Sequence, residues 1–87
     1  TQRLRKEENL LTNTALLEEK ILKSGYKKSY IAKSIGLSPY GLALKIQNTN
    51  EFKASEIDKL CILLGIDDLE ERCAIFFASQ VDEKSTN

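Results

Sequence analysis

Lysine and small polar side chains between residues 20 and 53 are the part of this sequence best equipped for chemistry with a ligand. The stretch contains seven lysines and one acidic residue, a charge of +6, although the 87-residue chain has no net charge. Residues 54–87 carry −5 and residues 1–19 carry −1. A basic segment inside a neutral chain is typical of a surface that meets phosphate groups. A lysine-rich solvated surface is the other interpretation, because charge alone does not identify a ligand.

The composition argues against catalysis and against metal binding. The chain contains no histidine and only two cysteines, Cys61 and Cys73. Two thiols do not complete the four-ligand shell of zinc, and a nucleophilic serine or cysteine usually requires a histidine base. The glycines are spread singly, so no glycine loop for phosphate is present. We therefore expect no enzyme, metal, cofactor or small-molecule ligand, and we interpret both cysteines as small core residues.

Length and hydropathy predict one small domain in the cytoplasm. No apolar run approaches the ~18 residues of a membrane-spanning helix, and no apolar leader is evident. The first eleven residues are polar, and methionine is missing from the chain. We expect residues 1–11 to be a flexible leader, tag or processed end, residues 12–79 to fold, and residues 80–87 to form a disordered tail.

Apolar residues recur at helical spacing and predict five short helices with no strand. The first is expected over about 12–24 and the second over 28–35, and Gly25 and Gly36 follow their ends. The third is expected over about 39–47, with Ser38 as its cap and Pro39 in its first turn. Caps are also expected from the following residues: one of Thr12, Asn13 and Thr14 for the first helix, Ser29 for the second, Ser55 for the fourth, and Asp67 or Asp68 for the fifth. The fourth helix should end at Gly65.

The predicted core consists of the apolar faces of these helices and of three anchors between them. The anchors are Leu37, Phe52 and Ile66. The faces are Ala15, Leu16 or Leu17, Ile21 and Leu22; Ile31, Ala32 and Ile35; Leu42 and Ile46; Ile57, Leu60, Cys61 and Leu64; and Leu69, Cys73, Ile75, Phe76 and Phe77.

The stretch YIAKSIGLSPYGLALKI (30–46) contains an interrupted helix, because the pattern stops at Gly36 and restarts at Ser38-Pro39. Two short helices joined by a turn with glycine form a helix-turn-helix, whose second helix can enter a DNA major groove. Residues 28–47, KSYIAKSIGLSPYGLALKIQ, resemble this motif in the lambda repressor and Cro family, in Ala32, Gly36, Leu37 and Leu42. The resemblance covers about residues 14–78 and is closest to small phage-type regulators.

This resemblance implies an all-α, lambda-repressor-like domain of five helices, with the helix-turn-helix at the second and third. It further implies sequence-specific binding of double-stranded DNA by a bacterial or phage-encoded transcriptional regulator. If Leu42 and Ile46 face inward, Tyr40, Leu44 and Gln47 face outward, with Gly41 and Ala43 beside them. We expect base readout from the outward residues and from the family positions at the turn: Ser38, Tyr40, Gly41, Leu44 and Gln47.

Two polar clusters flank the predicted recognition helix and are candidates for phosphate contacts. The first, Lys27, Lys28 and Ser29, opens the second helix, whose free amides favour an anion. The second follows the recognition helix and consists of Lys45, Asn48, Thr49, Asn50 and Lys53. If the first residues are native, Arg3, Arg5 and Lys6 could add a basic arm on DNA.

The fifth helix ends in three consecutive large apolar residues, Ile75, Phe76 and Phe77, which cannot all face one core. One or two of them are therefore candidate contacts in a homodimer on two half-sites, unless they fold under the N-terminal segment. The alternative function is a protein-interaction module, such as an antitoxin or antirepressor partner, that uses Tyr40, Leu44 and the acidic C-terminal half. Without an aromatic platform, RNA binding is the least supported option.

Overall fold

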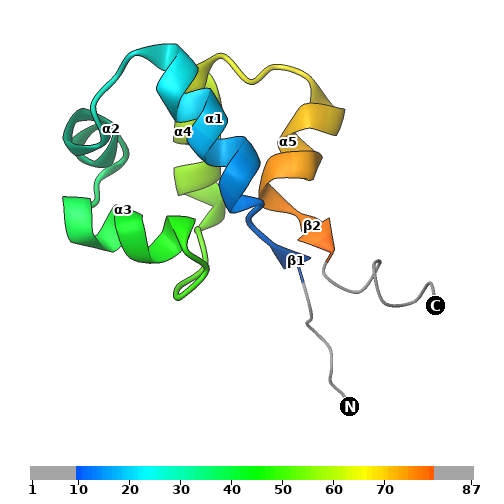
Figure 1. Ribbon diagram of the computed structural model, residues 1–87, viewed down its shortest axis with the longest axis horizontal. Coiled ribbons are helices and arrows are strands. Elements are labelled where there is room, and N and C mark those ends of the chain that lie inside the picture. Colours follow the sequence, from blue (N-terminus) through cyan, green and yellow to red (C-terminus); the bar gives the residue numbers. More distant parts are fainter. Residues whose placement is uncertain (1–9, 80–87) are drawn as a thin grey trace.

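The computed structural model describes residues 10–79, which fold into five short helices (Figure 1). They are α1 (Thr14–Ser24), α2 (Lys28–Ile35), α3 (Pro39–Ile46), α4 (Ala54–Leu64) and α5 (Leu69–Phe76). The prediction of a helical domain is confirmed, and each helix begins and ends close to the expected residues. The predictions for residues 1–9, including the basic arm, and for the tail 80–87 lie outside the described residues.

Two short strands, which the sequence pattern did not predict, join the two ends of the described chain. Strand β1 (Leu10–Leu11) pairs antiparallel with β2 (Ala78–Ser79). Two residues are too few to show the alternation by which a strand is recognised. Leu10 and Leu11, which the sequence assigned to the flexible N-terminal segment, are paired with Ser79 and Ala78 in this sheet.

Local signals account for most helix ends. The side chains of Asn13, Ser38 and Asp68 accept hydrogen bonds from the first turns of α1, α3 and α5. The predicted caps Ser29 and Ser55 are wrong, because Lys27 and Lys53 occupy the cap positions of α2 and α4. At α4 the carboxylate of Glu56 accepts a hydrogen bond from the backbone amide of Lys53 at 2.8 Å. This is the bond that the third helical residue makes to the cap residue in a capping box.

One core unites the five helices, and it contains most of the predicted residues. Fully or nearly fully buried are Leu17, Ile21, Ile31, Ala32, Ile35, Leu42, Ile46, Ile57, Leu60, Cys61, Ile66, Ile75 and Phe76. Leu37, Phe52 and Leu64 pack against this core from its edge. The prediction is wrong for five residues, which are exposed on α1 and on or directly after α5: Ala15, Leu22, Leu69, Cys73 and Phe77.

The five helices lie at two ends of the molecule and in a middle part between them. Helix α2 packs on α3 and α4, while α1 packs on α4 and α5. Figure 1 shows α2 and α3 at one end, α1 and α4 in the middle, and α5 with the strand pair at the other end. As a result, no other helix within residues 10–79 covers one long side of α3 (Figure 1).

Candidate nucleic-acid interface

Three residues reverse the chain between α2 and α3. Gly36 has φ 85°, a left-handed conformation that strains residues with a side chain. The Leu37 amide donates to the carbonyl of Ala32 at 2.8 Å, and the Leu37 side chain packs against the core. The Ser38 hydroxyl then accepts from the Gly41 amide at 2.9 Å, so α3 begins immediately. The turn fixes where the N-terminal end of α3 lies relative to α2.

Helix α3 buries the face that its spacing predicted, and the most exposed positions lie at its two ends. Leu42 and Ile46 are 1% and 2% exposed, whereas Tyr40 is 73% exposed. Ser38 and Gln47 are also exposed. The free face therefore carries a phenol near the start of α3 and an amide side chain directly after its end.

Three further residues of α3 are less exposed than the outward face of the predicted recognition helix would require. Gly41, Ala43 and Leu44 are half-buried rather than exposed. The carbonyl of Leu44 accepts the amides of Thr49 and Asn50 at 2.9 and 3.2 Å, so the following loop folds back beside it. A Cβ on residue 41 would lie 3.1 Å from the Ser38 hydroxyl oxygen, so glycine here also makes room for the cap.

The predicted phosphate contact from Lys45 is wrong. Lys45 is buried, and its Nζ lies 2.6 Å from Oε1 of Glu56 on α4. The residue follows Leu42 by three positions and therefore shares its inward face. A buried lysine requires a countercharge, and the sequence alone did not show that Glu56 would supply it.

Glu56 holds two elements together through one carboxylate oxygen. Its Oε1 accepts both the Lys45 ammonium at 2.6 Å and the Lys53 amide at 2.8 Å. Burial raises the pKa of this carboxyl, but the hydrogen bonds from Lys45 and Lys53 and their charges outweigh it and lower the pKa below the ordinary 4.5. The pair therefore joins the C-terminal half of α3 to the first turn of α4.

Asn48 likewise has a structural role in place of the predicted phosphate contact. Its backbone has φ 69°, and it is the one residue other than glycine with positive φ among residues 10–79. Its Oδ1 accepts the Thr12 amide, and its Nδ2 donates to the Thr12 carbonyl, both at 2.9 Å. Both polar atoms of the side chain are therefore engaged with the backbone ahead of α1.

The other predicted phosphate contacts are exposed and lie in two groups. Lys27, Lys28 and Ser29 lie at the start of α2, and Thr49, Asn50 and Lys53 lie between α3 and α4. Lys28 lies 2.9 Å from Glu18 of α1, with both side chains about half exposed. Such a surface ion pair contributes little stability and exchanges readily for another anion.

A pair of tyrosines beside the first group was missed at the sequence level. Tyr26 and Tyr30 are 42% and 51% exposed, and their ring centroids lie 5.1 Å apart. Their spacing of four residues was the available signal. Tyrosine hydroxyl groups often contact phosphates, so this pair extends the polar surface around Lys27 and Lys28.

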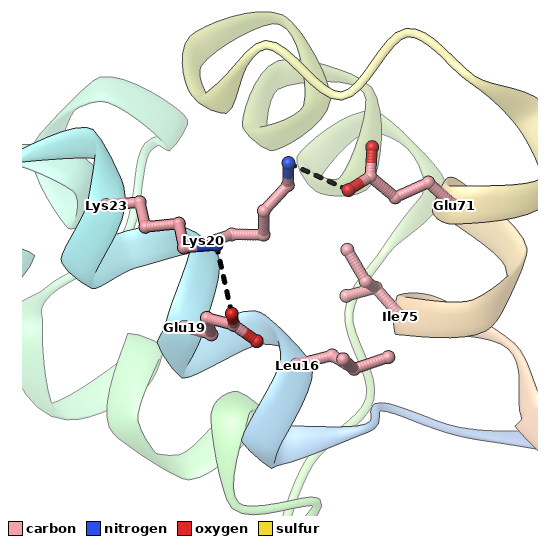
Figure 2. A pocket seen from close by; sticks show the side chains of 6 residues that line it. All are labelled: Leu16, Glu19, Lys20, Lys23, Glu71 and Ile75. Atoms are coloured by element: carbon pink, nitrogen blue, oxygen red, sulfur yellow. Dashed lines mark ion pairs between the residues drawn. The ribbon is translucent and has the colours of Figure 1, made fainter.

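A hollow between α1 and α5 has different chemistry (Figure 2). It measures about 120 Å³, and Leu16, Ile75 and two ion pairs line it, Lys20–Glu71 at 2.7 Å and Lys23–Glu19 at 3.0 Å. Ligand pockets are usually about 300 Å³ or larger. The charges of the hollow neutralise one another, so it does not resemble a ligand pocket.

Of the three candidate dimer contacts, one or two of which were expected at a seam, only Phe77 is exposed. Ile75 and Phe76 are 1% and 4% exposed and belong to the core, whereas Phe77 is 40% exposed. Helix α5 ends at Phe76, so the backbone turns before Phe77 and only this third side chain leaves the core.

Comparisons with known proteins place no constraint on this surface. No protein-family model, curated protein or solved structure matches the chain. Within residues 10–79, no helix has the length and apolar character needed to cross a membrane, and no group of metal-ligating side chains occurs.

Proposed function

We propose that this protein is a sequence-specific regulator of transcription that binds double-stranded DNA, of the phage repressor or Cro type. In this proposal α2 and α3 form the helix-turn-helix, and α3 enters the major groove. The observation that carries the proposal is the free face of α3, with exposed Tyr40 and Gln47, between two groups of exposed polar residues.

The free face of α3 suits contacts with base edges. The amide of Gln47 matches the donor and acceptor of adenine, and the Tyr40 hydroxyl can accept or donate a hydrogen bond. Ser38 and Gly41 lie at the start of α3, where a helix in the groove comes close to bases. Leu44 is half-buried and offers a smaller apolar contact than an exposed leucine would.

The phosphate contacts come from the two exposed groups without Lys45 and Asn48. Lys27, Lys28 and Ser29 lie at the N-terminal end of α2, where free amides and the helix dipole favour an anion. Thr49, Asn50 and Lys53 form the second group. Two groups on either side of a recognition helix would fix its position on the backbone.

A homodimer belongs to the same proposal, because one small motif binds DNA weakly and two half-sites strengthen it. The outward face of α5 is the surface we assign to the second copy. It carries Leu69, Cys73, Ala74 and Phe77, which are all exposed. Two eight-residue helices bury less than the ~1,600 Å² of a standard interface, so we expect the dimer to form mainly on DNA.

A protein-interaction module is the second candidate, and exposed apolar residues favour it. Ile62 is 82% exposed and Leu69 71%, in addition to Tyr40. Binding that relies on these side chains would depend little on salt, whereas phosphate contacts make binding weaken steeply as salt rises.

The test is an amide chemical-shift map of the protein with a mixed-sequence DNA duplex at low salt. We expect the largest changes over residues 27–30 and 38–53, and their loss at high salt. Changes confined to α1, α4 or α5, or no change in a folded protein, would refute DNA binding through α3. Lys20 lies in the hollow between α1 and α5, outside both groups, so Lys20→Gln is a suitable control variant for the loss of one positive charge.

A further inference from the structure

Hydrogen bonds from the segment before α1 reach the C-terminal end of α3. Thr12 is bonded through both its amide and its carbonyl to the side chain of Asn48, at 2.9 Å each. The Thr14 hydroxyl donates to the carbonyl of Ile46, the last residue of α3, at 2.6 Å. These partners are 36 and 32 residues apart in the chain. We call the three bonds the Thr12–Asn48 clasp.

The same segment is fixed at its other side to the end of α5. The Asn13 amide donates to the carbonyl of Ile75 at 2.6 Å, and Leu11 pairs with Ala78 in the two-stranded sheet. Figure 1 shows the strand pair beside the start of α1 and at the end of α5. The clasp therefore ties α3 to a part of the molecule that is itself anchored.

The backbone at Asn48 is adapted to the clasp. Its φ of 69° is accessible to glycine and, at lower cost than for most residues, to asparagine. The loop after it turns back so that the Thr49 and Asn50 amides reach Leu44. Glycine at position 48 would adopt the positive φ but would lack the side chain that bonds Thr12. The N48G variant therefore tests the clasp separately from the backbone conformation.

The clasp lies directly around one candidate reader of bases. Gln47 is exposed, and the residues on both sides of it, Ile46 and Asn48, carry the bonds to Thr14 and Thr12. The turn at Gly36 holds the other end of α3. The Lys45–Glu56 pair holds the C-terminal half of α3 to α4. Without the clasp, the end that carries Gln47 would lose its hydrogen bonds to Thr12 and Thr14 and would gain freedom on that side.

We infer that Thr12, Thr14 and Asn48 are positioning residues that hold the C-terminal end of α3 for reading of base edges, through hydrogen bonds made within the fold. This inference rests on the proposed function and deepens it. Misplacement of Gln47 weakens contacts with bases, whereas the exposed lysines keep their contacts with phosphates. The clasp should therefore govern specificity and leave sequence-independent affinity unchanged.

The test compares N48G and T14V with wild type and with S34A, a control that removes a hydroxyl-to-carbonyl bond, as T14V does, but on α2. Amide hydrogen exchange of the free proteins reports the clasp, and binding to a selected duplex and to a scrambled duplex reports specificity. We expect faster exchange at Thr49 and Asn50 in N48G and about a tenfold loss in the ratio of specific to non-specific affinity, the size of one good base contact. The salt slope should not change, and S34A should behave as wild type.

Each outcome decides between defined alternatives. Equal loss of specific and non-specific affinity in N48G and T14V would overturn the inference, because it would make the clasp a general support of the fold. Unchanged specificity in both variants would also overturn it. A wild-type protein that prefers no duplex would refute the proposed function itself. The N48A variant, which adds strain at φ 69° to the loss of the clasp, should lose more stability than N48G.

Discussion

Breaking the buried pair of Lys45 and Glu56 provides a strict test of the structure, because the sequence pattern placed Lys45 on the surface. Lys45→Met keeps the length of the side chain and removes the ammonium group 2.6 Å from Glu56. Removing one partner of a buried ion pair typically destabilises by about 3–5 kcal/mol. The remaining carboxylate keeps the Lys53 amide and lies in the first turn of α4, which favours an anion, so we expect about 3 kcal/mol.

Removing the other partner should destabilise the protein more. Glu56→Met leaves the ammonium of Lys45 buried without a countercharge and also frees the Lys53 amide. We expect about 4–5 kcal/mol. The double variant K45M/E56M leaves no unpaired charge, so its loss should be well below the sum of the two single losses. Lys59→Met, on an exposed position of α4, is the matched control and should change stability by about 0.5 kcal/mol or less.

Urea unfolding followed by circular dichroism between pH 3 and pH 7 measures these differences. In wild type the lowered pKa of Glu56 stabilises the fold above pH 4.5, and this contribution is lost as pH falls through the folded-state pKa. In K45M the carboxyl loses its largest opposing partner, so its pKa rises. The difference between K45M and wild type should therefore shrink in acid.

The refuting result is equally specific. If K45M loses less than about 1 kcal/mol and the difference does not depend on pH, then Lys45 is not buried in solution. A simultaneous fall of about one unit in the salt slope of DNA binding would restore Lys45 to the phosphate contacts and contradict the structure.

Three further predictions concern the exposed groups and the turn. Lys28→Ala should weaken binding to all duplexes about equally and lower the salt slope by about one unit, whereas Glu18→Gln should strengthen binding by freeing Lys28. Fluorescence anisotropy at increasing salt measures both effects, and an effect of Lys28→Ala confined to one base position would contradict a phosphate contact. Cys73, which is exposed, should react quickly with a maleimide, while Cys61 should react slowly because burial raises the pKa of its thiol. On DNA, oxidation should form a disulfide between the Cys73 residues of two copies. Protein that stays uncross-linked at full DNA occupancy would count against the α5 dimer. Gly36→Ala should lower the free energy of unfolding by about 1–2 kcal/mol because of its φ of 85°, and an unchanged value in thermal unfolding would show that the turn has relaxed.

The helices were predictable because the residues that begin and end them act on their immediate neighbours in the chain. Gly36 ends α2, Ser38 and Pro39 begin α3, and Asp68 begins α5, each through bonds within a few residues. Apolar spacing then placed Leu42 and Ile46 inside. These signals need no knowledge of the rest of the chain.

The errors come from contacts between distant residues. Lys45 was assigned to the surface because its charge is expensive to bury, and only the position of Glu56 on α4 offsets that cost. Asn48 was assigned to a phosphate because no local pattern connects it with Thr12. Leu69 and Cys73 follow the apolar spacing of α5, but no helix covers that side of α5. The candidate site on α3 and its flanks therefore stays a prediction, and within it Lys45 and Asn48 are engaged in contacts inside the fold.

Selection of bound duplexes from a random DNA library at moderate salt, followed by sequencing of the enriched pool, tests the proposed function most directly. DNA recognition by two copies predicts an inverted repeat whose half-site centres lie about one helical turn apart. The same selection with Gln47→Ala should relax the preference at one position of each half-site. No enrichment by a protein shown to be folded would contradict sequence-specific DNA binding and would favour a protein partner instead.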